Sequence, residues 1–404
     1  MLTTAPENGS LPMCGTSAAS SSCGVSPFSS ISGKTSIMAN VIEVNRIEDL
    51  HAYALTWERL FRKTPHATFF QTLDWLQTYW KFYGQNKTLR VLLVQVESEI
   101  IGILPLVEQR ETTHAGPVRV LTYPLDAWGS FFGPIGGEPT ATLFSACRYL
   151  AATSKQWDLF DLRWIEPEVD RGRTFNAMRC HGFTTVPYTW QTSYAIDLPG
   201  NFDDYLATRT PKFRASIRRA IRKAQEAGIV QERYRPEVDA TRPFSPNEEL
   251  YDRCVELARR TWQGGSSSGT TISHAETAEF FRECFLKASQ RGMLDLMTLR
   301  RDDELIAFSY NFCHQGRLLG MRMGYEPDCK RLSPGVTMLG MQIRDSIDRG
   351  DCRIDLGIDH PKAKERWSNK TLLSQRLCHY SRFSVQAQIL RWGHWLKYRS
   401  AAAA

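Results

Sequence analysis

From residue 41 onward, apolar residues recur with the periods of strands and helices. Val41–Val44 predicts a short strand, and Leu89–Val96 with Ile100–Leu106 predicts a hairpin around a polar turn. Between them, Asp49–Lys63 has the pattern of an amphipathic helix, and a second helix is predicted from the N-cap Thr72 to Tyr83. The remaining elements expected in the first half are the strands Val118–Thr122, Leu159–Trp164 and Thr192–Asp197 and the helices Thr140–Thr153 and Gly172–His181.

The second half repeats this order of elements. After a Gly/Ser loop at Gly264–Gly269 and a helix, a strand, an acidic turn and another strand follow again, and Glu304-Leu-Ile-Ala stands 205 residues after Glu99-Ile-Ile-Gly. Such self-similarity indicates an internal duplication. The elements expected in this half are the helices 211–227, Asn247–Trp262, Ala275–Arg291 and one from Val336 to Gly350, and the strands Val230–Tyr234, Leu294–Arg300, Leu305–Cys313, Arg317–Gly324 and Cys352–Leu356.

Composition separates a tail from the folded part. Residues 1–40 are rich in Ser, Gly, Thr and Pro, so we expect them to be disordered. They lack the basic start and apolar segment of a signal peptide, and Met38 is an alternative start residue. The longest apolar run, Ile100–Val107, is too short to cross a bilayer. The scattered cysteines form no C-x-x-C pair, which favours reduced thiols in a cytoplasm and no metal site.

Positive charge is concentrated in one predicted helix. The formal net charge is +7, and the stretch from Arg209 to Lys223 holds seven basic residues and no acidic one. Arg214, Arg218 and Arg222 recur at four-residue spacing beside Lys212, so like charges repel each other. The helix therefore either presents a solvated face or binds an anion, such as a phosphate, a nucleotide-sugar or the 3′-phosphate of coenzyme A.

The turn Ser333-Pro334-Gly335 stands between a strand and a helix. The backbone N–H groups of a helix start point at its N-terminal end, where the helix dipole favours a phosphate, and a glycine permits close approach. The same three residues are also an ordinary helix start, because proline is favoured in the first turn. On the residues alone both interpretations stay open.

With these residues the chain resembles the GNAT (Gcn5-related N-acetyltransferase) acyltransferases. The resemblance is to a divergent, CelD-like branch associated with cellulose and exopolysaccharide synthesis, and more distantly to the FemAB aminoacyltransferases. It rests on Lys330, the Ser-Pro-Gly turn, Asp355 in a strand and Lys364, over roughly residues 60–380. It implies acyl-CoA (acetyl-CoA) as co-substrate, without a metal. The implied donor-site residues are Lys330, Arg331, Ser333, Pro334, Gly335 and Val336. Ser333 replaces the first glycine of the family's usual pair, which puts some phosphate contacts in question.

The resemblance implies an α/β (α+β) fold of two tandem GNAT-like lobes, each with a mixed, mostly antiparallel sheet flanked by helices. We expect a degenerate lobe over residues 41–200, an acyltransferase lobe over 201–385, and a basic amphipathic helix and tail over 386–404. The second lobe would hold the acyl donor and the cleft between the lobes the acceptor. The last helix, Ser384–Tyr398, either packs on its own domain, which we favour, or lies in a membrane interface.

The motifs of common hydrolases and nucleotide-binding proteins are absent from the sequence. Acyl transfer to an amine needs a positioned thioester, a base for the amine and an acid for the thiolate. Glu326 or Asp359 is a candidate base and Tyr325 a candidate acid. Asp355 needs a partner in its apolar strand, either Lys364 or Arg353, and we expect Asp355 and Lys364 to align the acceptor.

The sequence therefore predicts a bacterial, cytoplasmic N-acyltransferase, or one peripheral at the inner membrane. Its acceptor would be an amine of a small-molecule, nucleotide-linked or sugar-derived compound, held by Lys212, Arg214, Arg218, Arg222 and Asp359. One alternative is a FemAB-like aminoacyltransferase, in which the basic helix would bind aminoacyl-tRNA, the one nucleic acid expected. Another is a non-catalytic scaffold of a polysaccharide-synthesis assembly.

Overall fold

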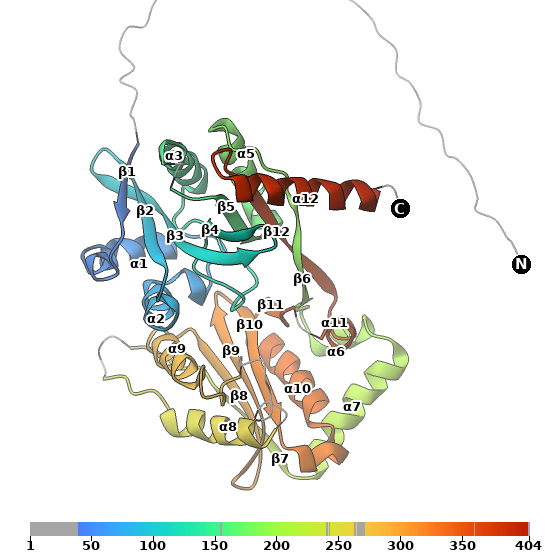
Figure 1. Cartoon of the computed structure of the whole chain (residues 1–404). Coiled ribbons are helices and arrows are strands. Elements are labelled where there is room, and N and C mark those ends of the chain that lie inside the picture. Colours follow the sequence, from blue (N-terminus) through green and yellow to red (C-terminus); the bar gives the residue numbers. More distant parts are fainter. Residues whose placement is uncertain are drawn as a thin grey trace, which may run out of the picture. The chain divides into compact units, whose positions relative to one another are not determined.

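The computed structural model describes residues 39–402, except 154–155, 240, 242, 262–263, 265–270 and 359. The predicted tail before residue 39, most of the Gly/Ser loop and Asp359 therefore lie outside the described residues. In the described part, twelve strands form a single sheet in the order β1-β2-β3-β4-β5-β12-β6-β11-β10-β9-β8-β7, with helices on its faces (Figure 1).

The first repeat of elements runs from β1 to β6. Its strands pair antiparallel except β4 and β5, which are parallel. The bounds are β1 (Asn40–Val44), α1 (Ala54–Arg62), α2 (Leu73–Tyr83), β2 (Thr88–Val96), β3 (Glu99–Thr113), β4 (Gly116–Thr122), α3 (Pro139–Ala152), β5 (Leu159–Ile165), α4 (Pro167–Asp170), α5 (Arg173–Cys180) and β6 (Tyr188–Asp197), with the 3-10 turns η1 (Glu48–Tyr53) and η2 (Phe69–Gln71).

The second repeat follows two linking helices, α6 and α7. Here β10 and β11 are the parallel pair. The bounds are α6 (Phe202–Ala207), α7 (Pro211–Glu226), β7 (Ile229–Tyr234), α8 (Glu248–Arg260), α9 (Ala278–Gln290), β8 (Leu294–Arg301), β9 (Glu304–His314), β10 (Arg317–Tyr325), the 3-10 segment η3 (Pro327–Leu332), α10 (Pro334–Asp348), β11 (Arg353–Asp355), α11 (Pro361–Glu365), β12 (Lys370–Tyr380) and α12 (Val385–Ala402).

The two repeats exchange their last strands. Reading the sheet from either edge gives the same series of five strands, β1 to β5 from one side and β7 to β11 from the other. The middle positions are then crossed: β12 pairs with β5, and β6 pairs with β11, each antiparallel. We call β1–β5 with β12 the first lobe, and β7–β11 with β6 the second lobe. The predicted domain boundary at residue 200 separates the two repeats along the sequence. The division of the chain into domains at this residue stays a prediction.

Local details repeat with the offset seen in the sequence. Glu97 and Asp302, 205 residues apart, both have positive φ (56° and 53°) in the turn before the third strand. The register of the hairpin shifts between Val94 and Gln95 in the first repeat, and between Leu299 and Arg300 in the second. A shared bulge and turn at one offset confirm the predicted tandem arrangement.

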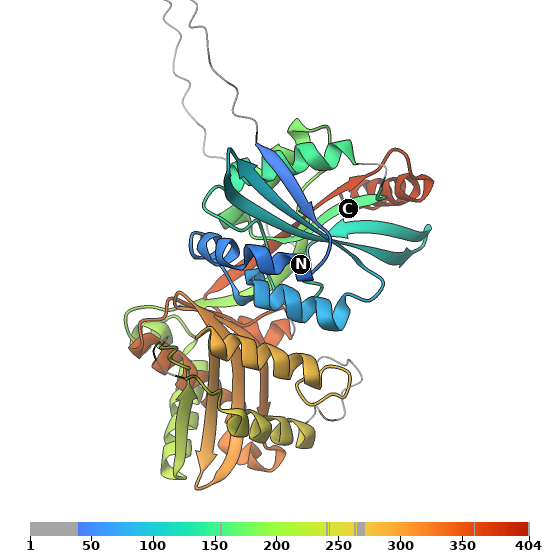
Figure 2. The ribbon, with the colours of Figure 1, turned by 90° about the vertical axis from the view of Figure 1, so that its left-hand side faces the viewer.

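Helices cover both faces of the second-lobe strands. Figure 1 shows α8 and α9 on one side of the strands and α7 and α10 on the other, and in Figure 2 α8 and α9 lie in front of the strands. Phe213, Ile217, Ile221 and Ala224 of α7 are buried, as the helical spacing predicts, and they join the cluster that α10 forms on the sheet. The helix α7 begins as expected, with Thr210 accepting a hydrogen bond from the N–H of Phe213 and Pro211 in the first turn.

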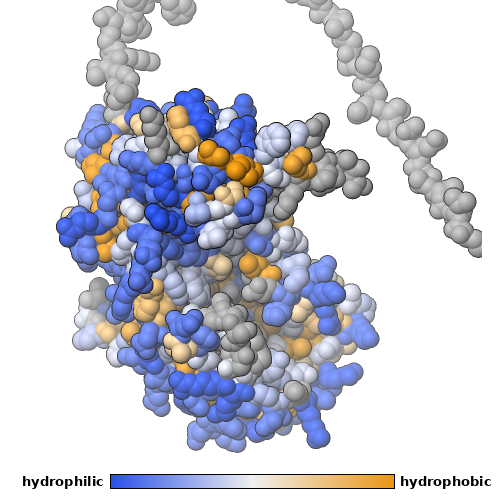
Figure 3. Space-filling model, in the orientation of Figure 1, coloured by the Kyte–Doolittle hydropathy of each residue, from blue (hydrophilic) through white to orange (hydrophobic). Residues whose placement is uncertain are grey.

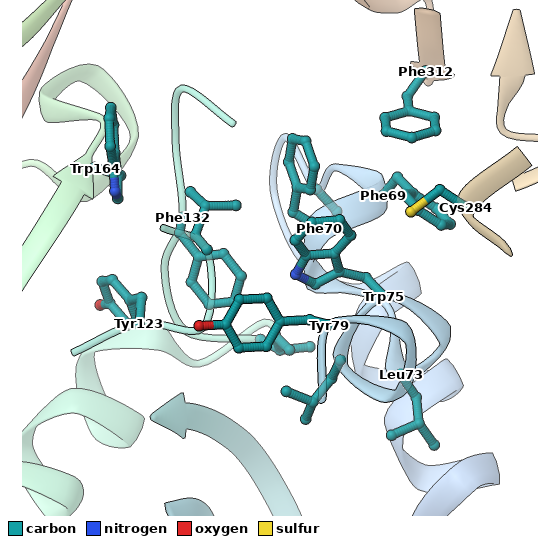
Figure 4. Packing of buried hydrophobic residues seen from close by; sticks show 14 of the residues in the cluster. Phe69, Phe70, Leu73, Trp75, Tyr79, Tyr123, Phe132, Trp164, Cys284 and Phe312 are labelled. Atoms are coloured by element: carbon teal, nitrogen blue, oxygen red, sulfur yellow. The ribbon is translucent and has the colours of Figure 1, made fainter. Parts of the chain in front are cut away.

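An aromatic core joins the lobes. The ring of Phe312, on β9, lies 4.5 Å from that of Phe69 and 5.8 Å from that of Phe70, both on η2 (Figure 4). Trp75 on α2 packs edge-on against Phe280 of α9, with ring centroids 5.7 Å apart. Such rings bury large apolar areas, so the lobes share one core and are not joined by a flexible contact.

Several expected elements differ in their bounds, and the strand β12 was not predicted. The helix expected over Asp49–Lys63 starts as the 3-10 turn η1 and becomes α-helical at Ala54, while α9 begins at Ala278, three residues after the predicted start.

The C-terminal helix α12 packs on the first lobe. It buries Ala387 and Leu390 against β4 and β12, as the favoured prediction for this helix expects. Of the helices in the described part of the chain, none combines the length and hydropathy needed to cross a membrane.

A buried ionic network supports the second lobe. The guanidinium of Arg233 is 1% exposed and lies 2.8 Å from Asp295 and 2.6 Å from Asp345. Asp295 is fully buried and also pairs with Arg235. Buried ion pairs contribute little relative to apolar residues, but the removal of one partner is costly.

We predict that Arg233→Ala lowers the free energy of unfolding by about 3 kcal/mol, because Asp295 and Asp345 lose a common partner. Arg259→Ala is the matched control, since the Arg259–Glu256 pair is exposed, and it should cost less than about 1 kcal/mol. Urea unfolding followed by circular dichroism measures both. Equal effects of the two substitutions would contradict this account of the network.

Candidate active site

The parallel strands β10 and β11 pair over only three positions. Arg317, Leu318 and Leu319 pair with Arg353, Ile354 and Asp355, and β10 continues to Tyr325 without β11 beside it. At the last pair the strands are tightly packed, since a Cβ on Gly320 would lie 3.0 Å from the carbonyl oxygen of Asp355. The pairing of the two strands therefore ends at Leu319 and Asp355. We call the stretch of β10 from this last pair to Tyr325, which has no β11 beside it, the V, with its closed end at Leu319 and Asp355.

Asp355 is held at this closed end by neutral hydrogen-bond donors. Its Oδ1 accepts hydrogen bonds from the Ser193 hydroxyl at 2.5 Å and from the N–H of Gly357 at 2.8 Å. Burial raises the pKa of the Asp355 carboxyl above its usual range. The hydrogen bonds, including one from Ser130, and the charge of Lys364 act in the opposite direction. A raised pKa brings a carboxylate closer to the range in which it exchanges protons with an amine.

Of the two partners expected for Asp355, Lys364 is the one beside it. A Cβ placed on Gly357 would lie 3.4 Å from the Lys364 ammonium, so this side chain returns over the end of β11. Arg353 instead forms an ion pair with Asp197, with Nε and Oδ1 2.5 Å apart. The structure thus brings Asp355 and Lys364 together, whereas their predicted role in aligning the acceptor stays a prediction.

The first repeat has a counterpart of Asp355. Phe160-Asp161-Leu162 corresponds to Ile354-Asp355-Leu356 at an offset of 194 residues, and each aspartate lies at the parallel strand pair of its lobe. Asp161 is fully buried, and its carboxylate contacts two guanidinium groups, those of Arg376 (2.5 and 2.7 Å) and Arg163 (2.7 Å). It is therefore bound in a structural ion-pair cluster.

The partners of the two aspartates occupy matching positions. Asp161 is opposite Cys378 and Asp355 is opposite Ala195, so Arg376 and Ser193, two residues earlier on each exchanged strand, are equivalent. At this equivalent position, Arg376 contacts the carboxylate of Asp161, and the hydroxyl of Ser193 contacts the carboxylate of Asp355. Only in the second lobe is the carboxylate left with neutral donors and one ammonium group nearby.

The predicted donor turn forms the start of α10. Ser333 adopts a left-handed conformation (φ 50°) and makes no side-chain cap, and Pro334 and Gly335 follow in the first turn. Gly335 faces the ring of Tyr325, since a Cβ there would lie 3.4 Å from Tyr325 Cε1. A left-handed residue before a helix start directs N–H groups into a concave surface that suits an anion. Arg331 is exposed beside the turn and Val336 half-buried, while the side chain of Lys330 lies outside the described part.

Tyr325 and Glu326 do not lie with Asp355. Tyr325 follows Leu319 by six residues along β10, which at about 3.3 Å per residue places it roughly 20 Å from the closed end of the V. Glu326 pairs with Arg260 at 3.1 Å, so its carboxylate already has a charged partner. The four candidate catalytic residues therefore occupy two places: Tyr325 and Glu326 at the donor turn, and Asp355 and Lys364 at the closed end.

The basic face of α7 is largely exposed and partly paired. Arg218 lies 2.8 Å from Asp203 and Arg222 lies 3.6 Å from Glu226, both pairs being exposed. Lys212 is exposed and Arg214 half-buried, and neither forms an ion pair among the described residues. The helix α7 packs against α10 and η3, and its first turn packs on Trp367 through Phe213. The predicted anion-binding role of the four residues stays a prediction.

A cleft between the lobes opens at the closed end of the V. A pocket of about 490 Å³ is lined by Asp355 and Leu319 of the second lobe and by Phe69, Phe131 and Glu166 of the first repeat. A neighbouring pocket of about 620 Å³ shares Phe131 and Glu166 and continues into the first lobe. Both lobes therefore contribute walls to an open space beside Asp355, whose lining is mostly apolar with a few charged side chains.

Charged groups of this cleft were missed by the sequence analysis. Glu166 lies 3.2 Å from Arg317, and both line the pocket. His66 lines the neighbouring pocket, and burial and the charge of Arg317 lower its pKa. No local pattern marks Ser193, Ser130 or Glu166, because their relation to Asp355 arises from the strand exchange. No cluster of three His, Cys, Asp or Glu side chains suited to a metal ion occurs in the described ranges.

The comparisons agree with this geometry. Residues 211–367, which contain the V, the donor turn and both Asp355 and Lys364, match the family model described as an acetyltransferase (GNAT) domain. No curated protein matches the chain in sequence. The CelD-like branch stays a prediction.

Several solved structures are similar to this chain over both lobes. FemX is similar with a TM-score of 0.55 at 10% identity, over 84% of this chain and 96% of that one. A conserved protein of unknown function from Bacteroides thetaiotaomicron has a TM-score of 0.50 at 12% identity, over 85% of this chain and all of its own. A tandem GNAT protein from the clavulanic acid biosynthesis pathway has a TM-score of 0.44 at 11% identity, over 84% of this chain and 98% of its own.

We predict that Asp355→Asn lowers kcat by about a hundredfold or more without loss of stability, if Asp355 exchanges the proton of the acceptor amine. Because the folded-state pKa is raised, the stability that Asp355 contributes is full below its unfolded value of 3.8 and is lost as pH rises through the folded value. The asparagine variant should therefore gain melting temperature relative to wild type as pH rises.

The pH profile distinguishes this role from a structural one. Ser193→Ala removes a hydrogen bond that favours the carboxylate, so the acidic limb of kcat/KM should move to higher pH while the plateau is retained. A structural Asp355 would leave the limb in place. An unchanged profile in Ser193→Ala together with full activity of Asp355→Asn would contradict the assignment.

Proposed function

We propose that this protein is a GNAT-type N-acyltransferase that transfers an acyl group from acyl-CoA to an amine. The observation that carries the proposal is the V between β10 and β11, with the start of α10 at its open end and Asp355 at its closed end, inside the segment that matches the acetyltransferase domain. A donor with an anionic group at one end and a thioester at the end of a long arm fits this separation.

The residues supply the steps that acyl transfer requires. The N–H groups at the start of α10 would hold the pyrophosphate of coenzyme A, and Gly335 leaves room for it. The pantetheine arm would follow β10 into the V and place the thioester near Leu319 and Asp355. As the amine forms its bond to the acyl carbon and the thioester bond breaks, Asp355 would take the proton of the amine and pass it to the departing CoA thiolate. Lys364 would orient the carboxylate through its charge.

The acceptor would enter from the cleft between the lobes. Its walls carry the carboxylate of Glu166 and the guanidinium groups of Arg317 and Arg353, so a polar amine fits better than an apolar one. We extend the proposal to a sugar-derived or nucleotide-linked amine of cell-surface polysaccharide synthesis. Its support is the resemblance of the Ser333-Pro-Gly, Asp355 and Lys364 pattern to the CelD-like branch.

We predict that Gly335→Val weakens the binding of acetyl-CoA at least tenfold, about 1.4 kcal/mol. The branched side chain would press against the Tyr325 ring or cover the N–H groups of the turn. Gly335→Ala is the matched control, because a lone Cβ makes only ordinary contact with the ring, and it should bind nearly as wild type. Calorimetry with acetyl-CoA and with free CoA measures both. Unchanged binding in a folded valine variant would remove the turn as the donor site.

Aminoacyl-tRNA is the competing donor, because the exposed face of α7 carries Arg218 and Arg222. Binding of a nucleic acid through several phosphates falls steeply with salt, by about a thousandfold or more between roughly 50 and 200 mM for six or more contacts. We predict only a shallow loss of acetyl-CoA affinity over this range and no measurable transfer from aminoacyl-tRNA. Transfer from aminoacyl-tRNA that Arg214→Gln weakens would support the competing function.

A further inference from the structure

The helix α12 carries an apolar stripe on the side that faces away from the protein. Val385, Ile389, Trp392 and Leu396 are 72%, 49%, 71% and 54% exposed. Their spacing of four, three and four residues places them on one face of the helix. Leu390 and the other inward residues pack on the opposite face, so the stripe is a second apolar surface in addition to the buried one. In Figure 3, apolar side chains gather at the surface over α12.

Basic groups border this stripe. Arg382 and Arg391 are exposed, and neither forms an ion pair among the described residues. The sequence from Arg366 to the end holds seven basic residues and no acidic one. Trp395, half exposed, adds a second large amphipathic ring next to the stripe. The helix therefore combines an outward apolar face, two tryptophans and a one-sided positive charge.

We propose that the outward face of α12 binds in the interfacial region of an anionic lipid bilayer, with the helix axis in the membrane plane. Partial burial of the stripe among headgroups removes apolar area from water, and anionic lipids attract the flanking arginines. A second copy of the chain is the less suitable occupant, because helix-on-helix contact would oppose basic residues without any acidic partner. The proposal does not depend on the proposed function.

The consequence is a protein that reaches a membrane surface without spanning it. The buried side of α12 holds the helix on β4 and β12, and Tyr380 donates or accepts a hydrogen bond with His394 Nδ1 at 2.6 Å. Because α12 is packed on the first lobe, this lobe would bind the membrane together with α12 as one rigid unit. An acceptor exposed at the membrane surface would then be within reach of the chain.

The test is flotation of the full chain with vesicles. Wild type should bind vesicles that contain phosphatidylglycerol and bind pure phosphatidylcholine vesicles much less. Ile389→Gln with Trp392→Gln should reduce binding at least about tenfold, and Arg382→Gln with Arg391→Gln roughly tenfold or more. Leu55→Gln, at an exposed leucine of α1 (89% exposed), is the matched control and should bind as wild type.

Three outcomes would overturn the proposal. These are no binding to phosphatidylglycerol vesicles, binding that the Ile389/Trp392 double variant retains, or a dimer in analytical ultracentrifugation that this variant abolishes, which would assign the stripe to a second copy. Melting temperature shows whether each variant is folded. Because the stripe is solvent-exposed, the double variant should melt at or above the wild-type temperature.

Discussion

The exchange of β6 and β12 is the constraint on which the rest of the structure depends. The strand β11 has only three residues, and its antiparallel partner is β6, from the other repeat. The same exchange supplies the hydroxyl of Ser193 to Asp355 and the guanidinium of Arg376 to Asp161. Neither repeat therefore has a complete sheet or a complete carboxylate environment of its own, which makes the two lobes one folding unit.

Within this shared frame the two lobes have diverged in chemistry. Arg376 and Arg163 contact Asp161, so this carboxylate is part of a buried ion-pair cluster. At the equivalent places of the second lobe stand Ser193 and Gly357, which donate hydrogen bonds but no charge. This difference gives a physical basis for the expectation that the first lobe is degenerate: its carboxylate has become part of the packing, whereas that of Asp355 opens on a cleft.

Periodicity was sufficient to predict most elements, because each depends on neighbours in the sequence. The caps at Thr72 and Thr210 and the turn at Ser333 are local signals, and they lie where the pattern places them. The register between β10 and β11 is not local. This register places Asp355 beside Leu319 and far from Tyr325. The sequence analysis proposed Tyr325, Glu326, Asp355 and Lys364 as one catalytic set, whereas the fold places them at two separate positions.

Serine and glutamate residues of the site were hidden for the same reason. Ser193 lies inside a strand of ordinary composition, and only the crossing of β6 into the second lobe brings it to Asp355. Glu166 follows β5 directly, yet its partner Arg317 begins β10, 151 residues later in the sequence. A local sequence pattern within one repeat cannot predict contacts with residues of the other repeat.

The exchange also explains how a lobe without a donor turn stays essential. Phe69 and Phe70 of the first lobe pack on Phe312, and Phe131 and Glu166 line the pocket beside Asp355. Loss of the first lobe would thus expose an aromatic core and remove one wall of the cleft together with β12. The second lobe needs the first as its partner in folding, and under the proposed function the second lobe would hold the donor while the first forms the wall against which an acceptor is placed.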